Sequence, residues 1–182
     1  MYHMRLLLKA LIYCSIFVLC QSVWADQTRR APSDDGVFTA GPYYNPATKS
    51  YFELIRTSDE LNWAGAYNEA KNHKFKNTVG HLATISRPET HLFLIKSFSF
   101  LNDTWIGLRF YCDNSALIWT DGALHPRKSF DNWGEIEGQA NINCAANDYQ
   151  GTFINAPVLQ WQLADNTKFS AYILVEYSTG KR

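Results

Sequence analysis

The segment Trp105-Ile106-Gly107-Leu108, followed by Trp119-Thr120-Asp121-Gly122 and Phe130-Asp131-Asn132-Trp133, says more about the fold than any other part of the chain. A buried tryptophan ring removes a large apolar area from water, so three within so short a stretch indicate one compact core. Residues 117–120 are β-prone and end at Asp121-Gly122, a dipeptide that favours a turn. We therefore predict strands joined by loops here, without a catalytic constellation.

A first helix is predicted upstream of these tryptophans. Trp63, Ala66, Tyr67 and Ala70 fall on one face at helical spacing. Asn62, which precedes them, is a favourable N-cap because its side chain can accept a hydrogen bond from a free backbone N–H group. We expect the helix to begin directly after Asn62.

A second short helix is predicted further along the chain. Ser86 and Glu89 have the spacing of a capping box, in which each side chain bonds the other residue's backbone N–H. Leu92, Phe93 and Ile95 would then form the apolar side of this helix.

Three apolar segments predict strands. Residues 51–55 and 80–85 are short, and we expect the second to be buried. The longer apolar run at residues 172–177 is typical of a central strand with both faces buried.

The first 25 residues have the layout of a secretory signal peptide. Basic Arg5 and Lys9 precede an uncharged apolar run at residues 10–20, and Ala25 stands directly before Asp26. The alternative is a single membrane anchor, but the run is shorter than the roughly 20 residues that span a bilayer. We expect cleavage after Ala25 and a secreted, periplasmic or extracellular protein with no membrane span after signal removal.

The rest of the chain is predicted to hold one domain. Residues 26–42 form a polar lead-in, residues 43–178 the domain, and residues 179–182 a tail. The whole chain has 17 basic and 17 acidic residues, and the basic ones form no stripe that could follow a phosphate backbone. Nucleic acid is therefore excluded as an expected partner.

Two cysteines remain once the leader is set aside, because Cys14 and Cys20 lie within it. In an oxidising compartment, Cys112 and Cys144 are expected to form a disulfide. The alternative is a pair of buried free thiols.

Taken in order, these segments resemble the C-type lectin-like domain of the C-type lectin superfamily. The resemblance implies an α+β fold with two helices packed on antiparallel sheets, both termini in one sheet, and a long loop region at roughly residues 109–160 that carries binding. It covers about residues 43–177, and the matching segments are 61–70, 80–85, 105–108, 119–122, 132–133, 144–145, Trp161 and 172–176.

The calcium pattern of the family is not reproduced here. Calcium-dependent members carry a Glu-Pro-Asn or Gln-Pro-Asp triplet after the loop tryptophan, an acid before the next cysteine, and a later Trp-Asn-Asp. At these places the chain has residues 135–137 or 137–139, Ile142, and Gln162-Leu163. Since Ca²⁺ takes about 6–8 oxygen ligands, we expect no metal and no cofactor. An altered Ca²⁺ site remains the alternative, built from Glu135, Glu137, Asn141, Asn143 and Asp148.

The disulfide pattern of the family also differs here. The usual long bridge, from the first helix to the last strand, has no cysteines in this chain. Cys144 matches the first cysteine of the second bridge, whose usual partner after Trp161 is missing. The resemblance therefore leaves Cys112 as the partner of Cys144, and it assigns Trp133 to the core.

The resulting hypothesis is a non-enzymatic recognition module that binds a glycan or a protein surface through the loop region. One alternative is a calcium-dependent carbohydrate-binding lectin with an altered metal site. A less favoured one is a secreted glycoside hydrolase that uses Glu135 and Glu137 as its two carboxylates. Oligomeric state and ligand identity stay open. The predicted ligand-binding residues are Tyr111, Glu135, Glu137, Gln139, Asn141, Asn143, Asp148 and Tyr149.

Overall fold

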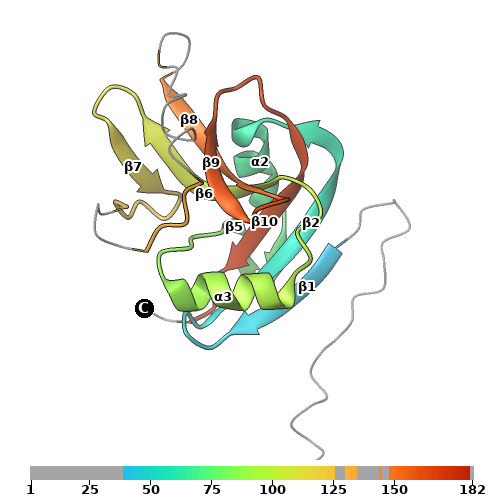
Figure 1. The fold of residues 1–182 in the computed structure, drawn as a ribbon. Coiled ribbons are helices and arrows are strands. Elements are labelled where there is room, and N and C mark those ends of the chain that lie inside the picture. The colour runs from blue at the N-terminus through green and yellow to red at the C-terminus, as the bar shows by residue number, and fades with distance from the viewer. Residues whose placement is uncertain (1–38, 126–129, 135–143, 145–147, 181–182) are drawn as a thin grey trace, which may run out of the picture. The chain divides into compact units, whose positions relative to one another are not determined.

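The structure is a computed structural model that describes residues 39–125, 130–134, 144 and 148–180. Figure 1 shows the order of its elements along the chain. They are β1 (Thr39–Asn45), β2 (Ser50–Leu61), α2 (Trp63–Ala70), β3 (Lys74–Phe75), β4 (Thr78–Val79), β5 (His81–Leu82), α3 (Pro88–Ser97), β6 (Thr104–Tyr111), β7 (Ala116–Trp119), β8 (Tyr149–Asn155), β9 (Gln160–Ala164) and β10 (Ser170–Tyr177).

One mixed sheet organises the domain. Its strands lie in the order β1-β2-β10-β6-β8-β9, with β5 paired to β10 and β7 paired to β6. Neighbours are antiparallel except β10 and β6, which run parallel. The first and last strands of the chain therefore lie on either side of β2, close together in the sheet (Figure 1). The predicted α+β class with a largely antiparallel sheet is confirmed.

The first strand begins earlier than the predicted start of order. Thr39 pairs with Ile55 in the β1–β2 ladder, so residues 39–42 belong to a strand and not to a polar lead-in. Polar composition suggested a loose segment, but β1 is an edge strand and edge strands tolerate exposed polar positions.

Strand β10 fulfils the prediction of a central strand buried on both faces. Side chains alternate between the two faces of a strand. Ile173 and Val175 belong to the core cluster under α2, whereas Leu174 belongs to the cluster under α3. All three are fully buried, so this strand separates and supports both halves of the core.

The first helix forms as its sequence predicts. Helix α2 begins at Trp63, and the Asn62 side chain accepts a hydrogen bond from Gly65 N at 3.0 Å. Trp63, Ala66 and Ala70 are buried against the sheet. The predicted cap and the predicted apolar face are both confirmed.

The predicted cap of the second helix is wrong. Helix α3 begins at Pro88, its N-cap is Arg87, and no side chain caps it. Proline lacks a backbone N–H and fits the first helical position, so it sets the start one residue later than Ser86 requires.

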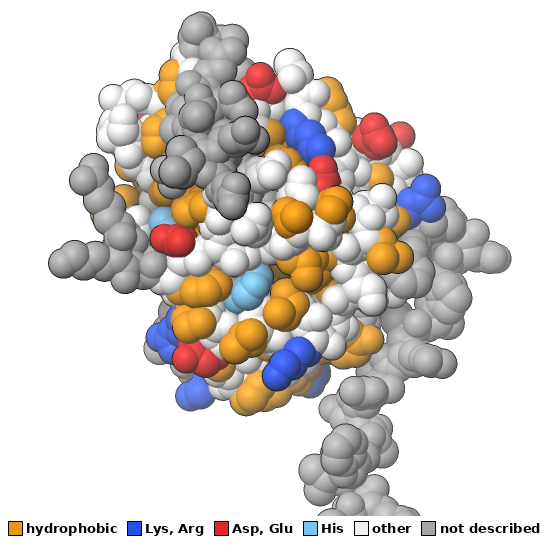
Figure 2. All heavy atoms as spheres, viewed as in Figure 1, with side chains coloured by type: hydrophobic (Ala, Val, Ile, Leu, Met, Phe, Trp, Pro, Cys, Tyr) orange, Lys and Arg blue, Asp and Glu red, His pale blue; other side chains and the backbone are white. Residues whose placement is uncertain are grey.

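The predicted apolar side of α3 is also wrong in part. The buried residues of this helix are Thr90 and Leu94, whereas Leu92 is 49% exposed. Figure 2 shows hydrophobic side chains on the surface over α3. Leu92 lies two residues before buried Leu94, about half a turn around the helix, so its side chain faces away from the core.

The tryptophan-rich segments form the core as predicted. Trp105 and Trp119 are buried, and β6 and β7 pair as a hairpin. Gly122, at φ +85°, closes the turn after β7.

No helix among the described residues is long and apolar enough to cross a membrane.

Candidate functional site

The end of β6 meets the start of β8 at the base of the loop region. Tyr111 pairs directly with Tyr149, and Arg109 pairs with Gly151. Arg109 and Tyr111 are two residues apart in one strand, so they share a face of the sheet. The register shift in β6 between Ile106 and Arg109 sets which residues face α2 at this end.

Gly151 makes room on that face for the ring of Trp63 from helix α2. A Cβ at Gly151 would lie 2.3 Å from Trp63 Cγ, closer than any side chain tolerates. The indole is fixed further by the hydrogen bond that Trp63 Nε1 donates to Ile106 O at 2.8 Å. Because Gly151 has no side chain, helix α2 can pack closely against β8.

Arg109 lies at the centre of a group of aromatic rings. Its guanidinium carbon is 4.5 Å from the ring centroid of Tyr111, 4.9 Å from that of Trp63, 5.0 Å from that of Tyr149 and 6.0 Å from that of Tyr67. Cation–π attraction acts over such distances. We call these five residues the arginine–aromatic cluster.

The rings of the cluster also contact one another. Trp63 and Tyr67 are stacked with centroids 5.4 Å apart, and Tyr149 meets the Trp63 ring edge-on at 5.9 Å. The three tyrosines are half-buried, whereas Trp63 is 1% exposed. Buried Trp63 therefore forms the base of the cluster, and the three half-buried tyrosines form its partly exposed edge.

The charge of Arg109 is not neutralised by a carboxylate among the described residues. The Arg109 Nη2 group donates a hydrogen bond to the Tyr111 hydroxyl, and its other contacts in the described part of the chain are with rings. A second cation stands beside the cluster, because Lys71 Nζ lies 3.6 Å from the Tyr67 centroid. Lys71 likewise forms no ion pair with a described residue.

A disulfide joins the end of β6 to the loop region. Cys112 and Cys144 are bonded, with their Cα atoms 5.6 Å apart, which confirms the predicted bridge. Cys112 N also donates a hydrogen bond to Asp148 O at 3.0 Å. The disulfide bond and the β6–β8 pairing together hold in place the two segments that lead into the loop region.

The structure brings three of the predicted site residues together and leaves five outside its described part. Tyr111 and Tyr149 have ring centroids 6.5 Å apart, and exposed Asp148 precedes Tyr149. The five that lie outside the described residues are Glu135, Glu137, Gln139, Asn141 and Asn143.

Sequence reasoning missed Arg109 and placed Tyr67 only on a core face. A signal for Arg109 was present, because it stands two residues before Tyr111 in a predicted strand segment. Tyr67 follows Trp63 by one helical turn, which places their rings on one side of α2. The approach of α2 to β6 that joins these pairs depends on tertiary structure.

Gln162 and Leu163 are the two described positions of the family's calcium motif. Leu163, in β9, has no oxygen in its side chain, and the Gln162 Oε1 atom accepts a hydrogen bond from Asn155 Nδ2 at 3.4 Å. Among the described residues, no three His, Cys, Asp or Glu side chains are grouped as an ion requires. The other positions of the motif, residues 135–139 and Ile142, lie outside the described part.

A second aromatic group supports the loop region from the other face of the sheet. Trp161 is buried, and the rings of Trp119, His125, Phe130 and Trp133 meet it edge-on at 5.6–6.0 Å. Trp133 is half-buried and bridges to Trp161, which agrees with its predicted core role.

Two histidines beside this aromatic group are shifted toward their neutral forms. Burial lowers the pKa of His91, whose ring contacts Phe130 at 5.4 Å. Burial also lowers the pKa of His125, and the charge of Asp131 opposes part of that shift. The protonated form of each imidazole is therefore disfavoured in the folded domain.

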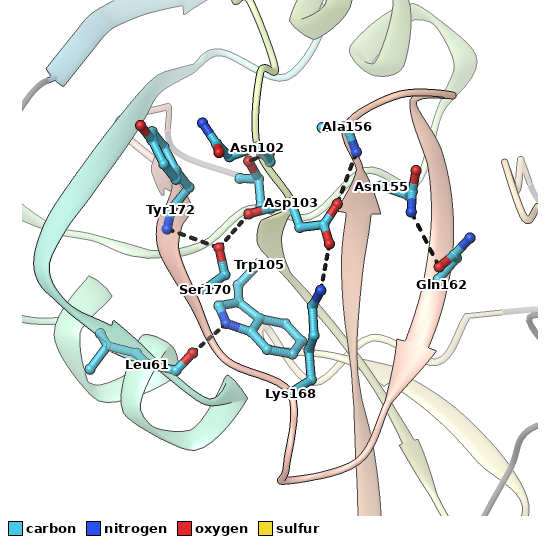
Figure 3. Close-up of polar contacts among 11 residues, drawn as sticks. Leu61, Asn102, Asp103, Trp105, Asn155, Ala156, Gln162, Lys168, Ser170 and Tyr172 are labelled. Carbon is cyan, nitrogen blue, oxygen red and sulfur yellow. Dashed lines mark hydrogen bonds and ion pairs between the residues drawn. The ribbon is translucent and has the colours of Figure 1, made fainter.

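The opposite end of β6 is closed by a polar network (Figure 3). Asp103 pairs with Lys168 Nζ at 2.5 Å and accepts a hydrogen bond from Ala156 N at 3.1 Å. Ser170 Oγ donates to Asp103 O, and Trp105 Nε1 donates to Leu61 O at 2.7 Å. A cavity of about 650 Å³ adjoins this network. Of its two cations, Arg56 and Lys168, Lys168 pairs with the Asp103 carboxylate.

Comparisons with known proteins find relatives only among solved structures. No protein-family model matches the chain, and no curated protein sequence matches it.

The matching structures are lectin domains. The carbohydrate-recognition domain of the human scavenger receptor C-type lectin is 17% identical, with 75% of this chain and 97% of that chain covered at a TM-score of 0.54. The cow C-type carbohydrate-recognition domain of CD23, in the presence of a GlcNAc2Man3 oligosaccharide, is 22% identical over 70% and 87% at 0.51.

A third match is the C-type lectin CEL-I from Cucumaria echinata, 18% identical over 70% of this chain and 89% of that chain at a TM-score of 0.51. All three are C-type lectins or carbohydrate-recognition domains. At such identities the match establishes the fold, and the described chain is a C-type lectin-like domain by its architecture.

Proposed function

We propose that this chain is a secreted, non-enzymatic recognition module that binds a glycan or a protein surface through its loop region, without the usual calcium site. The observation that carries the proposal is the arginine–aromatic cluster at the base of that region. Half-buried tyrosines and an arginine are the residue types that most often act as binding hot spots. Here they are held rigidly by α2, by the β6–β8 ladder and by the Cys112–Cys144 bond.

The solved structures favour a glycan over a protein as the ligand. The cow CD23 domain was determined in the presence of an oligosaccharide, and another neighbour of the same fold, SPL-1, in complex with GlcNAc. Aromatic rings offer flat apolar faces with a fixed geometry, which suits the C–H faces of sugar rings.

The calcium-free part of the proposal depends on Leu163 and Gln162. At these two motif positions, the Gln162 amide oxygen already accepts a hydrogen bond and the Leu163 side chain has no oxygen, and both features disfavour Ca²⁺. Saturating Ca²⁺ should therefore leave the melting temperature unchanged. A ligand at 100 times its Kd would add about 2.7 kcal/mol, which a thermal scan detects. A clear rise would instead support a calcium-dependent lectin with an altered site.

Secretion is the remaining part, and the layout of residues 1–25 supports it. N-terminal sequencing of exported protein should begin at Asp26. A retained N-terminus would contradict the signal peptide without affecting the binding proposal.

The binding test is a glycan screen on the purified domain with and without a chelator. Tyr111→Ala and Tyr149→Ala should each weaken capture by about thirtyfold, since truncating a hot-spot aromatic costs about 2 kcal/mol. Glu137→Ala should weaken it as well if the loop carries ligand contacts. Tyr44→Ala is the matched control, because Tyr44 is 47% exposed on β1, away from the cluster.

Two outcomes would overturn the proposal. Normal binding by all the folded loop variants would place recognition on another face. Turnover of a glycan that is lost in Glu135→Gln or Glu137→Gln would identify a glycoside hydrolase.

A further inference from the structure

The charge balance of the arginine–aromatic cluster indicates which chemical group its ligand carries. Arg109 is half-buried, and its guanidinium is surrounded by four rings. Rings attract a cation through their π faces but carry no net charge. Taking a charged group out of water is costly unless an opposite charge accompanies it. Among the described residues, no carboxylate forms an ion pair with Arg109.

We propose that Arg109 binds a sulfate or carboxylate group of an acidic saccharide, whose sugar ring packs on the half-buried tyrosines of the cluster. This inference rests on the proposed recognition function and specifies the class of its ligand. The guanidinium is planar and presents paired N–H donors that match two oxygens of one anionic group. Because four rings surround the guanidinium, little side-chain freedom remains to be lost when the anion binds.

Lys71 strengthens the case for an anion. Its ammonium lies over the ring of Tyr67, and that same ring also faces Arg109. Lys71 is exposed and has no ion-pair partner among the described residues. Two cations that share one aromatic ring and pair with no described carboxylate form a positive edge to the cluster, suited to a ligand with more than one anionic group.

The tyrosines favour a saccharide over an acidic peptide. Tyr67, Tyr111 and Tyr149 are half-buried, so each still has accessible ring surface. A pyranose ring with an acidic substituent can place its C–H face on a tyrosine ring while its anionic group reaches the guanidinium. The Tyr111 hydroxyl, which already accepts a hydrogen bond from Arg109, can donate its own proton to an anionic oxygen.

Asp148 is a carboxylate that adjoins the cluster in the sequence. It is exposed, directly precedes Tyr149, and forms no ion pair with Arg109 or Lys71. A carboxylate at this place repels an anionic ligand, so its removal should strengthen binding. A ligand without charge would not respond in this way.

The experiment measures binding of three hexasaccharide probes to the whole secreted domain by calorimetry. The probes are a heparin-derived hexasaccharide, the same material after desulfation, which keeps its carboxylates, and neutral chitohexaose. We expect the heparin-derived probe to bind most tightly, the desulfated probe more weakly, and the neutral probe weakest. The order of the first two separates sulfate from carboxylate as the preferred group.

Variants test whether Arg109 is responsible. Arg109→Gln should weaken binding of the heparin-derived probe by about tenfold or more, since a lost charge-assisted hydrogen bond costs this much. Arg109→Lys should recover little, because a point charge cannot replace the paired donors. Lys71→Gln, at an exposed position where unfolding is not expected, should weaken binding about threefold. Asp148→Asn should strengthen it.

The matched control is Arg56→Gln, which removes one exposed arginine beside the closed end of β6. Its affinity should equal that of the unmodified domain.

Equal losses in Arg56→Gln and in the Arg109 and Lys71 variants would show a non-specific charge effect and overturn the inference. A neutral probe that binds as well as the sulfated one, and is lost in Tyr149→Ala, would also overturn it while leaving the proposed function intact. A sulfated peptide is measured as a fourth probe, and its tight binding with no binding of any saccharide would overturn this inference too. Absence of binding by every saccharide and peptide at this end would count against the proposed function itself.

Discussion

The two ends of strand β6 each place a cation against an aromatic ring, yet they differ in how that cation is balanced. At the Thr104 end, Lys168 Nζ lies 4.7 Å from the Phe153 centroid and pairs with Asp103. At the Tyr111 end, Arg109 contacts four rings and no described carboxylate. The charge of Lys168 is paired within the protein, whereas the charge of Arg109 is paired with no carboxylate of the described residues. The difference separates a structural end of the strand from an end suited to recognition.

The largest expected effect is at the closed end. Trp105 is fully buried, and its indole N–H donates to Leu61 O. Trp105→Ala should lower the free energy of unfolding by about 3–5 kcal/mol, measured by urea denaturation. Tyr111→Ala at the open end should cost less because Tyr111 is only half-buried. Equal losses would mean that the open end is as much part of the core as the closed end.

The disulfide should have the next largest effect, at the open end. Replacing both Cys112 and Cys144 by serine removes the bond that restrains the intervening chain in the unfolded state. We expect a loss of about 3–4 kcal/mol in unfolding free energy. Reduction of the unmodified protein should reproduce the loss, and mass spectrometry under non-reducing conditions should find no free thiol. Two alkylatable thiols in secreted protein would contradict the bridge.

Salt should distinguish the two cations with a smaller effect. The Lys168–Asp103 pair is partly exposed, with side-chain exposures of 33% and 24%. Lys168→Gln should cost about 0.2–1 kcal/mol at low salt and less at high salt, because ions screen such pairs. Arg109→Gln should leave the salt dependence of stability unchanged, since no described carboxylate attracts Arg109. A similar salt response in both variants would reveal an acidic partner for Arg109.

The smallest effect should come from pH at the loop face. The pKa values of His91 and His125 are lowered by burial, so the unfolded chain binds protons at a higher pH than the folded one. Stability should be full above the unfolded value of about 6.5 and decline as pH falls below it. Denaturant midpoints at pH 7.5 and 5.5 measure the decline, and His91→Phe should reduce it. Higher stability at pH 5.5 would contradict the assignment.

The sequence predicted best the features that local chemistry sets. Asn62 marked the start of α2, and the apolar run at residues 172–177 marked the central strand, because capping and burial leave direct patterns. The start of α3 was missed by one residue because Pro88 overrides the Ser86–Glu89 spacing. The buried face of α3 was also missed in part, because residues 92–95 are all apolar and a continuous run does not mark one side of a helix.

The candidate site was less accessible to prediction. Tyr111 and Tyr149 were identified from their place beside the loops, and the structure pairs them across two strands. Arg109 was not identified, since its importance comes from rings contributed by a helix more than thirty residues earlier in the chain. A contact of this kind follows from the seating of α2 on the sheet, which no local pattern records.

Gly151 has a consequence for recognising this arrangement in other sequences. Because any larger residue there would collide with Trp63, the cluster requires a glycine opposite its arginine. The cluster can therefore be described by a sequence motif with three parts. The first is a tryptophan at the start of the first helix with a tyrosine one turn later. The second is Arg-x-Tyr-Cys at the end of one strand, and the third is Tyr-x-Gly at the start of the neighbouring strand. Sequences of this fold that carry all three parts form a testable group, and those with alanine or a larger residue at the glycine should lack the anion site even where the arginine is present.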